Sequence, residues 1–262
     1  MPERRKDIRD VLSDTARRKR RVAEVRFGGA PTSGEVPRDV YVAACQAIAT
    51  PLGADGYTYA KSGPKLSRKS QDFSFRLSFQ SSHHNTPGEL VVLWIHANVM
   101  SPTLKKWRTG HVCLREGSDF VAGGQIGNLL PRHSWMEWNL ALPGDRDQQI
   151  ADAIATIRRV AYPYFAMFDD IPRLVARLVV ENVPSFDPAS ALDFLMCFAS
   201  QSEALRAARR MLRQLPGAEE RYPIALAQFR RDGLPPHMLS THGDVLAAAT
   251  ITYDFPELRF AV

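Results

Sequence analysis

A strict alternation of apolar and polar residues over positions 73–80 places the strongest constraint on what this sequence can fold into. The even positions of this run are polar, and the odd positions hold Phe73, Phe75, Leu77 and Phe79. A period of two predicts a β-strand with one buried and one solvated face. Residues 90–100 repeat this period after a turn that contains Pro87-Gly88. The two runs together predict an antiparallel hairpin.

The even-numbered positions of this hairpin would share one face. They carry polar and aromatic side chains, namely Arg76, Ser78, Gln80, Trp94, His96 and Asn98. A turn centred near Thr86 would place Arg76 opposite His96, with Ser78 opposite Trp94. A shift of two residues would place Arg76 opposite Trp94 instead.

Two interpretations fit that face. As a ligand-facing surface, it would use Trp94 as a stacking platform and Arg76 as a clamp for an anion or a carboxylate. As an ordinary half-solvated sheet face, it would have Trp94 packed under a loop or a helix. We expect a basic rim in loops or strand ends around the hairpin, formed by Lys61, Lys65, Arg68, Lys69, Lys105, Lys106 and Arg108. Trp107 or Tyr59 could add a stacking surface beside it.

The remaining pattern predicts further short strands and many helices. Apolar residues recur at helical spacing after Pro37, and short strands are predicted around residues 57–59, 66–69, 119–125 and 134–140. A helical stripe follows Pro143, and Pro163 is expected to kink or end that helix. The fold class predicted is therefore α+β, with an antiparallel sheet of about five strands flanked by helices and followed by a C-terminal helical extension. The expected divisions are a basic arm over 1–27, a linker over 28–36, an α+β domain over 37–170 and a helical extension over 171–262.

The net charge of +6 is unevenly distributed along the chain. Residues 1–27 hold ten Lys/Arg and five Asp/Glu, which gives +5, and residues 57–115 hold nine and two, which gives +7. Residues 116–262 hold fourteen and eighteen, which gives −4. The arm contains five adjacent cations, namely Arg17, Arg18, Lys19, Arg20 and Arg21. These two basic regions favour an acidic partner.

The composition excludes several classes of protein. A hydrophobic share of 45% and a charged share of 24% are typical of soluble globular chains. The three cysteines fit neither a disulfide framework nor a zinc site, and no apolar leader or membrane-length run is present. We therefore expect a cytoplasmic protein without a membrane partner. No metal site and no cofactor are expected, since no standard nucleotide-binding, hydrolase or metalloprotease motif occurs.

The order of several short motifs resembles that of a known family. After the first helix come Gly53-Ala54-Asp55-Gly56-Tyr57, a Phe-rich strand ending in Gln80-Ser81-Ser82, and a strand leading to Ser101-Pro102-Thr103. Trp138-Asn139-Leu140 and Tyr162-Pro163-Tyr164-Phe165 follow. Over roughly residues 38–178 the chain resembles the bacterial domain of unknown function 4304 family. The resemblance implies a compact α+β domain with an interaction or immunity-type role in a bacterial system, and no catalytic residue.

The function predicted from these features is a non-enzymatic cytoplasmic binding module for a protein partner, which uses the polar sheet face and its basic rim. The alternative is nucleic-acid binding through the arm and the same rim. A lesser alternative is an uncharacterised enzyme that uses Arg76, His96 and Glu137 at the same face. The oligomeric state is left open.

Overall fold

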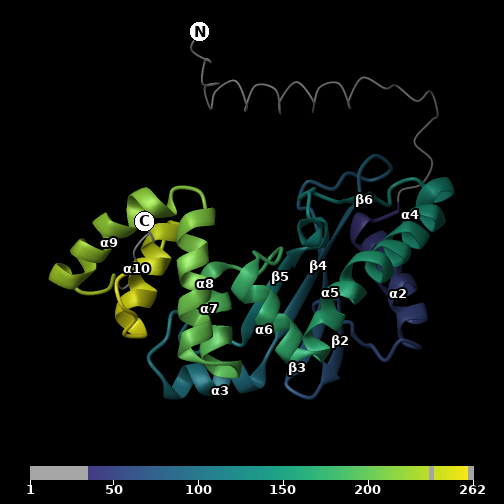
Figure 1. The fold of residues 1–262 in the computed structure, drawn as a ribbon. Coiled ribbons are helices and arrows are strands. Elements are labelled where there is room, and N and C mark those ends of the chain that lie inside the picture. The colour runs from purple at the N-terminus through teal and green to yellow at the C-terminus, as the bar shows by residue number, and fades with distance from the viewer. Residues whose placement is uncertain (1–34, 236–238, 259–262) are drawn as a thin grey trace, which may run out of the picture. The chain divides into compact units, whose positions relative to one another are not determined.

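The computed structural model describes residues 35–235 and 239–258. The basic arm with its five adjacent cations therefore lies outside the described residues, as does most of the linker over 28–36. The described chain has the α+β fold that the sequence predicts: an antiparallel sheet, helices packed against it, and a helical C-terminal part (Figure 1).

The sheet has the strand order β1-β2-β3-β4-β5, and a short sixth strand pairs with β4. Each neighbouring pair is antiparallel. The strands are β1 (Thr58–Ala60), β2 (Lys65–Ser70), β3 (Phe73–Ser81), β4 (Val92–Met100), β5 (Phe120–Gln125) and β6 (Trp138–Asn139). Odd positions of β3 and β4 are buried and most even positions are half-buried, so the predicted alternation is confirmed.

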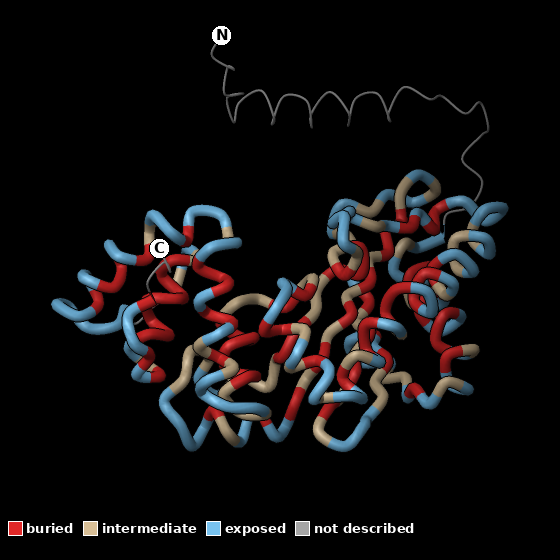
Figure 2. The backbone as a smooth tube through the Cα atoms, viewed as in Figure 1, coloured by how far each residue is buried: buried red, intermediate tan, exposed pale blue. Residues whose placement is uncertain are grey.

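Several helices cover the odd-numbered face of this sheet, and the last two pack mainly on other helices instead. Their bounds are α2 (Pro37–Leu52), α3 (Pro102–Gly110), α4 (Pro143–Thr156), α5 (Tyr162–Ala166), α6 (Ile171–Val180), α7 (Pro188–Phe198), α8 (Gln201–Gln214), α9 (Ala218–Asp232) and α10 (His242–Thr252), with 3-10 turns η1 (Ile126–Leu129) and η3 (Met167–Asp169). In Figure 1, α2 lies to the right of the strands and α7 and α8 lie to their left. Phe75 stacks on Phe165 at 4.9 Å between ring centroids, and Phe73 lies 6.4 Å from Phe194. Figure 2 shows buried backbone along the strands and the helices beside them.

The register of the hairpin differs from both predicted registers. Arg76 lies opposite Asn98, Ser78 opposite His96, and Gln80 opposite Trp94. Asn85 explains the shift, because its side chain bridges the two ends of the connecting loop. Its amide nitrogen donates to Ser81 Oγ at 2.7 Å, and its amide oxygen accepts from the Val92 backbone N–H at 2.9 Å. These two bonds hold the strand ends in a register that the turn residues alone did not indicate.

The predicted strand over 134–140 is present only as β6. The residues before it leave the sheet ladder and cross toward η1, where Ser134 donates its backbone N–H to the Gly127 carbonyl at 3.3 Å. This approach requires glycine, because a Cβ at position 127 would lie 1.9 Å from the Ser134 carbonyl oxygen. The segment over 131–137 is therefore a crossing loop rather than a strand.

The helix that precedes Pro163 does not end there. It passes from α4 through η2 (Ile157–Ala161), a turn of π-helix, and continues directly as α5. Proline has no backbone N–H to donate, and its ring conflicts with the carbonyl four residues earlier. The wider π turn relieves this conflict, so the chain remains helical through Pro163.

Candidate functional site

The even-numbered side of β3 and β4 forms the candidate site, which we call the open sheet face. It holds Arg76, Ser78, Gln80, Trp94, His96 and Asn98 together, as the sequence predicts. Lys69 joins this face, because it lies opposite Ser74 in the β2–β3 ladder. Across β5, His96 lies opposite Gln125 and Asn98 lies opposite Gly123. The face is thus a polar surface spread over four strands.

Arg76 is held in place on this face by a carboxylate at the start of β5. Its Nη2 lies 3.7 Å from Asp119 Oδ2, and each side chain is 39% exposed. An ion pair this exposed contributes little to stability, typically below 1 kcal/mol. The guanidinium group therefore stays available to a second carboxylate at small cost.

Two tryptophans lie at the other end of the open sheet face. The Trp94 indole N–H donates to Glu137 Oε2 at 3.1 Å, and its ring meets Trp135 edge to face at 5.7 Å between centroids. Trp135 belongs to the crossing loop and is 58% exposed. Trp94 therefore packs under a loop, as the second interpretation predicts, and that loop presents another indole, Trp135, to solvent. The ligand-facing interpretation stays a prediction.

The crossing loop is fastened to the sheet by Gln125, which is buried. Its side-chain amide donates to the Met136 carbonyl, and its side-chain oxygen accepts from the Gly127 backbone N–H at 2.8 Å. Together with the close approach at Gly127, these bonds determine where Trp135 stands. Glycine at 127 and glutamine at 125 are supporting residues that the sequence pattern did not single out.

His96 occupies the middle of the face between Ser78 and Gln125. Its Nε2 is buried and has no hydrogen-bond partner in the described part of the chain. Burial lowers the pKa of His96, because the charged imidazolium loses hydration there. The ring is therefore neutral at pH 7 and acts as a polar packing group.

Two of the predicted rim residues lie elsewhere. Arg68 is opposite Phe75, on the helix-covered side, with its guanidinium carbon 5.2 Å from the centre of the Phe75 ring. Arg108 is fully buried. Lys105, Lys106 and Trp107 belong to α3 rather than to a loop or a strand end, and Trp107 stacks on His111 at 5.0 Å. The predicted basic rim is thus not a continuous feature.

Arg108 instead joins α3 to the helical layer. Its Nε donates to Asp193 Oδ2 of α7 at 2.6 Å, and its Nη1 donates to the carbonyls of Ser118 and Phe120 at 3.0 and 2.6 Å. Asp193 Oδ1 accepts from the Leu114 backbone N–H at 3.1 Å and from the Tyr253 hydroxyl. We call this network the buried arginine junction. The sequence places Arg108 among exposed lysines and gives no sign of a partner 85 residues away.

The lesser alternative, acid–base catalysis by Arg76, His96 and Glu137, receives no support from these contacts. Glu137 bonds Trp94, Arg76 pairs with Asp119, and no ion pair or hydrogen bond links His96 to Glu137 among the described residues. Within the same residues, no group of three or more histidine, cysteine or acidic side chains is arranged to hold a metal ion. No helix in the described ranges has the length and apolar content to cross a membrane.

A second polar surface, on α8, was not predicted. Arginines at positions 206, 209, 210 and 213 recur at three- and four-residue steps within this helix. The same spacing is common on solvated helix faces, so the sequence alone did not distinguish it.

Comparison with family models, with curated proteins and with solved structures finds no match to this chain. The resemblance to the domain of unknown function 4304 family therefore stays a prediction, as do the activities it implies.

Proposed function

We propose that this chain is a non-enzymatic binding module for a protein partner, and that the open sheet face is its contact surface. The observation that carries the proposal is the pair of indoles at Trp94 and Trp135, one anchored and one 58% exposed, beside a polar strand surface. Tryptophan and arginine are the residues most enriched at the energetic centres of protein interfaces. The immunity-type or accessory role in a bacterial cytoplasm, which the family resemblance implies, belongs to the same proposal.

The polar groups of the open sheet face support this function. Arg76 and Asp119 supply one charge of each sign, and Ser78, Gln80 and Asn98 supply donors and acceptors that can pair with a partner's backbone. A surface with mixed polarity and an aromatic anchor suits a protein better than a phosphate chain, which would be repelled by Asp119 and Glu137.

A site-specific crosslink tests the proposal. In the test variant, a photoreactive phenylalanine analogue replaces Trp135 in the full chain. The matched control carries the same analogue at Ile224 of α9, which is 60% exposed. Both variants are expressed in the cells that naturally make this protein. We expect a discrete adduct from position 135 that protease degrades and nuclease does not. Equal labelling from position 224, or an adduct removed by nuclease, would contradict the proposal.

A second variant separates loss of contact from loss of fold. Gly127→Ala displaces the crossing loop, because the added Cβ has no room beside Ser134. We expect it to abolish the crosslink from position 135 while circular dichroism shows the helices intact. If the crosslink persists at full yield, the partner does not need the crossing loop in the position that Gly127 gives it, which would contradict the role assigned to this anchored loop.

A further inference from the structure

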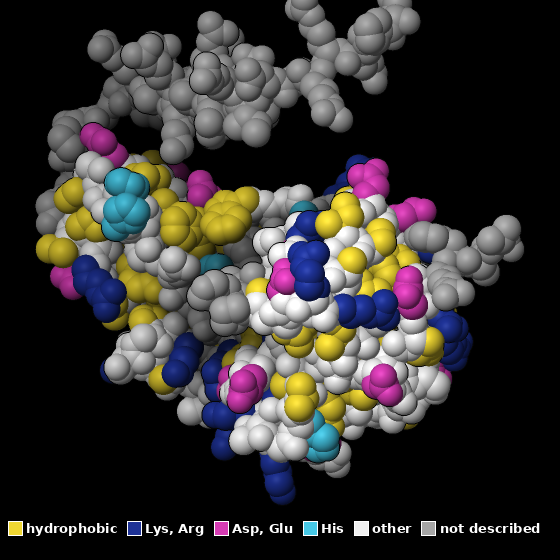
Figure 3. All heavy atoms as spheres, turned by 90° about the vertical axis from the view of Figure 1, so that its left-hand side faces the viewer, with side chains coloured by type: hydrophobic (Ala, Val, Ile, Leu, Met, Phe, Trp, Pro, Cys, Tyr) yellow, Lys and Arg dark blue, Asp and Glu magenta, His cyan; other side chains and the backbone are white. Residues whose placement is uncertain are grey.

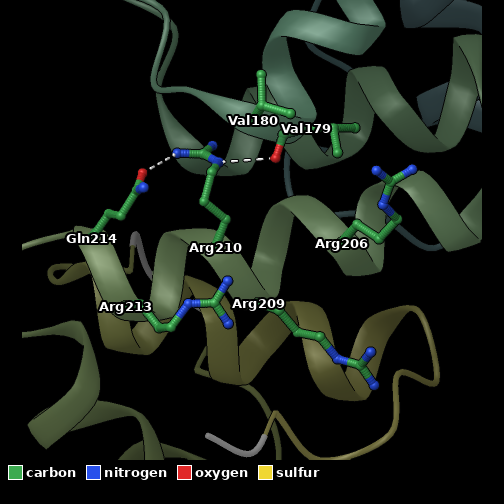
Figure 4. Close-up of a pocket in the computed structure, with 7 residues that line it drawn as sticks. All are labelled: Val179, Val180, Arg206, Arg209, Arg210, Arg213 and Gln214. Carbon is green, nitrogen blue, oxygen red and sulfur yellow. Dashed lines mark hydrogen bonds between the residues drawn. The ribbon is translucent and has the colours of Figure 1, made fainter. Parts of the chain in front are cut away.

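Four arginines lie on one side of α8, and we call the three outer ones, Arg206, Arg209 and Arg213, the arginine row. The 3.6-residue period confines all four to about 100° of the helix circumference. Together with the end of α6 they line a surface hollow of about 410 Å³. Its lining consists of Val179, Val180, Arg206, Arg209, Arg210, Arg213 and Gln214 (Figure 4).

The fourth arginine, Arg210, holds the row in place. It is buried, its Nε donates to the Val179 carbonyl at 3.1 Å, and its Nη2 donates to the Leu178 carbonyl at 3.2 Å. Its Nη1 donates to Gln214 Oε1 at 2.9 Å. These bonds satisfy carbonyls at the C-terminal end of α6 and attach α8 to it. The helix that carries the row is therefore fixed to α6, so its backbone loses little conformational entropy when a ligand binds.

The guanidinium groups of the row differ in their availability. Arg206 pairs with Glu203 at 3.0 Å on its own helix. Arg209 and Arg213 are exposed and have no ion pair or hydrogen bond from their side chains within the described residues, and Figure 4 shows both pointing away from α6. Like charges four residues apart on a helix repel each other. An anion bound between Arg209 and Arg213 would remove that repulsion.

The surroundings limit what such an anion can be. Glu203 and Glu181 lie near the row, and each is paired with an arginine of its own helix, namely Arg206 and Arg177. No aromatic side chain lines the hollow, so it lacks the ring platform on which single-stranded nucleic-acid sites usually stack successive bases. Val180 is 65% exposed beside the arginines and offers an apolar contact. In Figure 3, basic and acidic side chains are mixed on the end of the molecule that carries α9 and α10, so no extended positive surface is seen there.

We propose that the arginine row is a docking surface for a short acidic segment of a protein partner. The planar guanidinium fork matches a carboxylate in two parallel hydrogen bonds, and Arg209 and Arg213 can each make such a pair. Val180 would receive an apolar side chain between the acidic ones. The proposal goes beyond the open sheet face, because it concerns a separate helix and a different class of contact.

Fluorescence polarisation with a labelled Glu-rich peptide that has a central leucine tests the proposal on the full chain. The double variant Arg209→Glu with Arg213→Glu should bind the peptide at least roughly tenfold more weakly. The matched control, Arg230→Glu with Arg231→Glu on α9, makes the same change in net charge at two exposed arginines. It should bind within about twofold of the unaltered chain, because long-range charge alone contributes little at physiological salt.

Two further measurements test whether the row recognises carboxylates through its guanidinium groups. Arg209→Lys with Arg213→Lys keeps the charge and removes the fork, so we expect intermediate affinity. A single-stranded oligonucleotide of equal charge should compete poorly with the peptide. The proposal is overturned if the peptide does not bind saturably, if both double variants lose affinity equally, or if the oligonucleotide binds more tightly than the peptide.

Discussion

The buried arginine junction and the arginine row use the same side chain in opposite ways. At the junction, Arg108 is wholly enclosed and donates to one carboxylate and two carbonyls. On α8, Arg209 and Arg213 are exposed and unbonded in the described residues. Removing a partner from the first would leave a buried charge uncompensated, whereas the second has no internal partner to lose. The comparison shows that an arginine's role depends on what faces it, not on its neighbours in sequence.

The largest expected effect comes from the carboxylate of the junction. Asp193→Asn leaves Arg108 buried without a counter-charge, so the free energy of unfolding should fall by about 3–5 kcal/mol in urea denaturation. Asp119→Asn is the matched control, because it removes the partner of the half-exposed Arg76 and should cost less than about 1 kcal/mol. Equal losses in the two variants would break the contrast between buried and exposed arginines.

A smaller loss should follow from the hydroxyl that completes the junction. Tyr253→Phe removes the donor to Asp193 Oδ1, and a hydrogen bond to a charged group contributes about 2 kcal/mol. Tyr57→Phe provides the comparison, since the Tyr57 hydroxyl is buried without a partner in the described residues. That variant should be neutral or slightly more stable in thermal denaturation. Were Tyr57→Phe the more harmful of the two, the bonding assigned to Tyr253 would be wrong.

Adjacent residues of α8 sharpen the comparison within one helix. Arg210→Met keeps the length of the side chain but removes the donors to the α6 carbonyls, which should lower the free energy of unfolding by about 1–2 kcal/mol. Arg209→Met should change it by less than about 0.5 kcal/mol, as surface substitutions usually do. Chemical denaturation of both variants in the same buffer measures the difference.

The smallest expected effect is the pH dependence due to His96. Burial lowers the pKa of His96 below its ordinary value of 6.5, so the unfolded chain takes up this proton first as the pH falls. Stability from this group is therefore complete above pH 6.5 and decreases below it. His96→Gln should flatten that part of a stability profile measured between neutral and mildly acidic pH. An unchanged slope would mean that the imidazole remains hydrated on the open sheet face.

The sequence predicted features that depend on neighbouring residues better than contacts between residues far apart in the chain. The alternation around Phe75 reports directly which face of a strand is buried, and both strands of the hairpin follow it. The register depended on Asn85, whose two side-chain bonds are invisible in a pattern of polarity. Arg108 was assigned to a surface because its carboxylate partner comes from a distant helix.

The arginine row was missed for a related reason. In the sequence, an arginine that bonds the end of another helix, as Arg210 does, cannot be told from one without an ion pair or hydrogen bond among the described residues, as Arg213 is. Only the packing of α6 against α8 separates the two cases. For the open sheet face, the sequence predicted the six residues that share it but not the crossing loop that brings Trp135 to Trp94.

The turn of π-helix at Ile157–Ala161 makes the length of its helix as important as its composition. Its wider turn accommodates one residue more than a regular α-helix would over the same rise. Losing that extra residue would close the turn into regular α-helix and leave the direction of α5 unchanged. Losing a residue from α4 instead would rotate α5 by about 100° relative to the sheet. Phe165 would then face away from Phe75, with which it now stacks. This helix should therefore tolerate the loss of one residue within Ile157–Ala161 better than the loss of one within Pro143–Thr156.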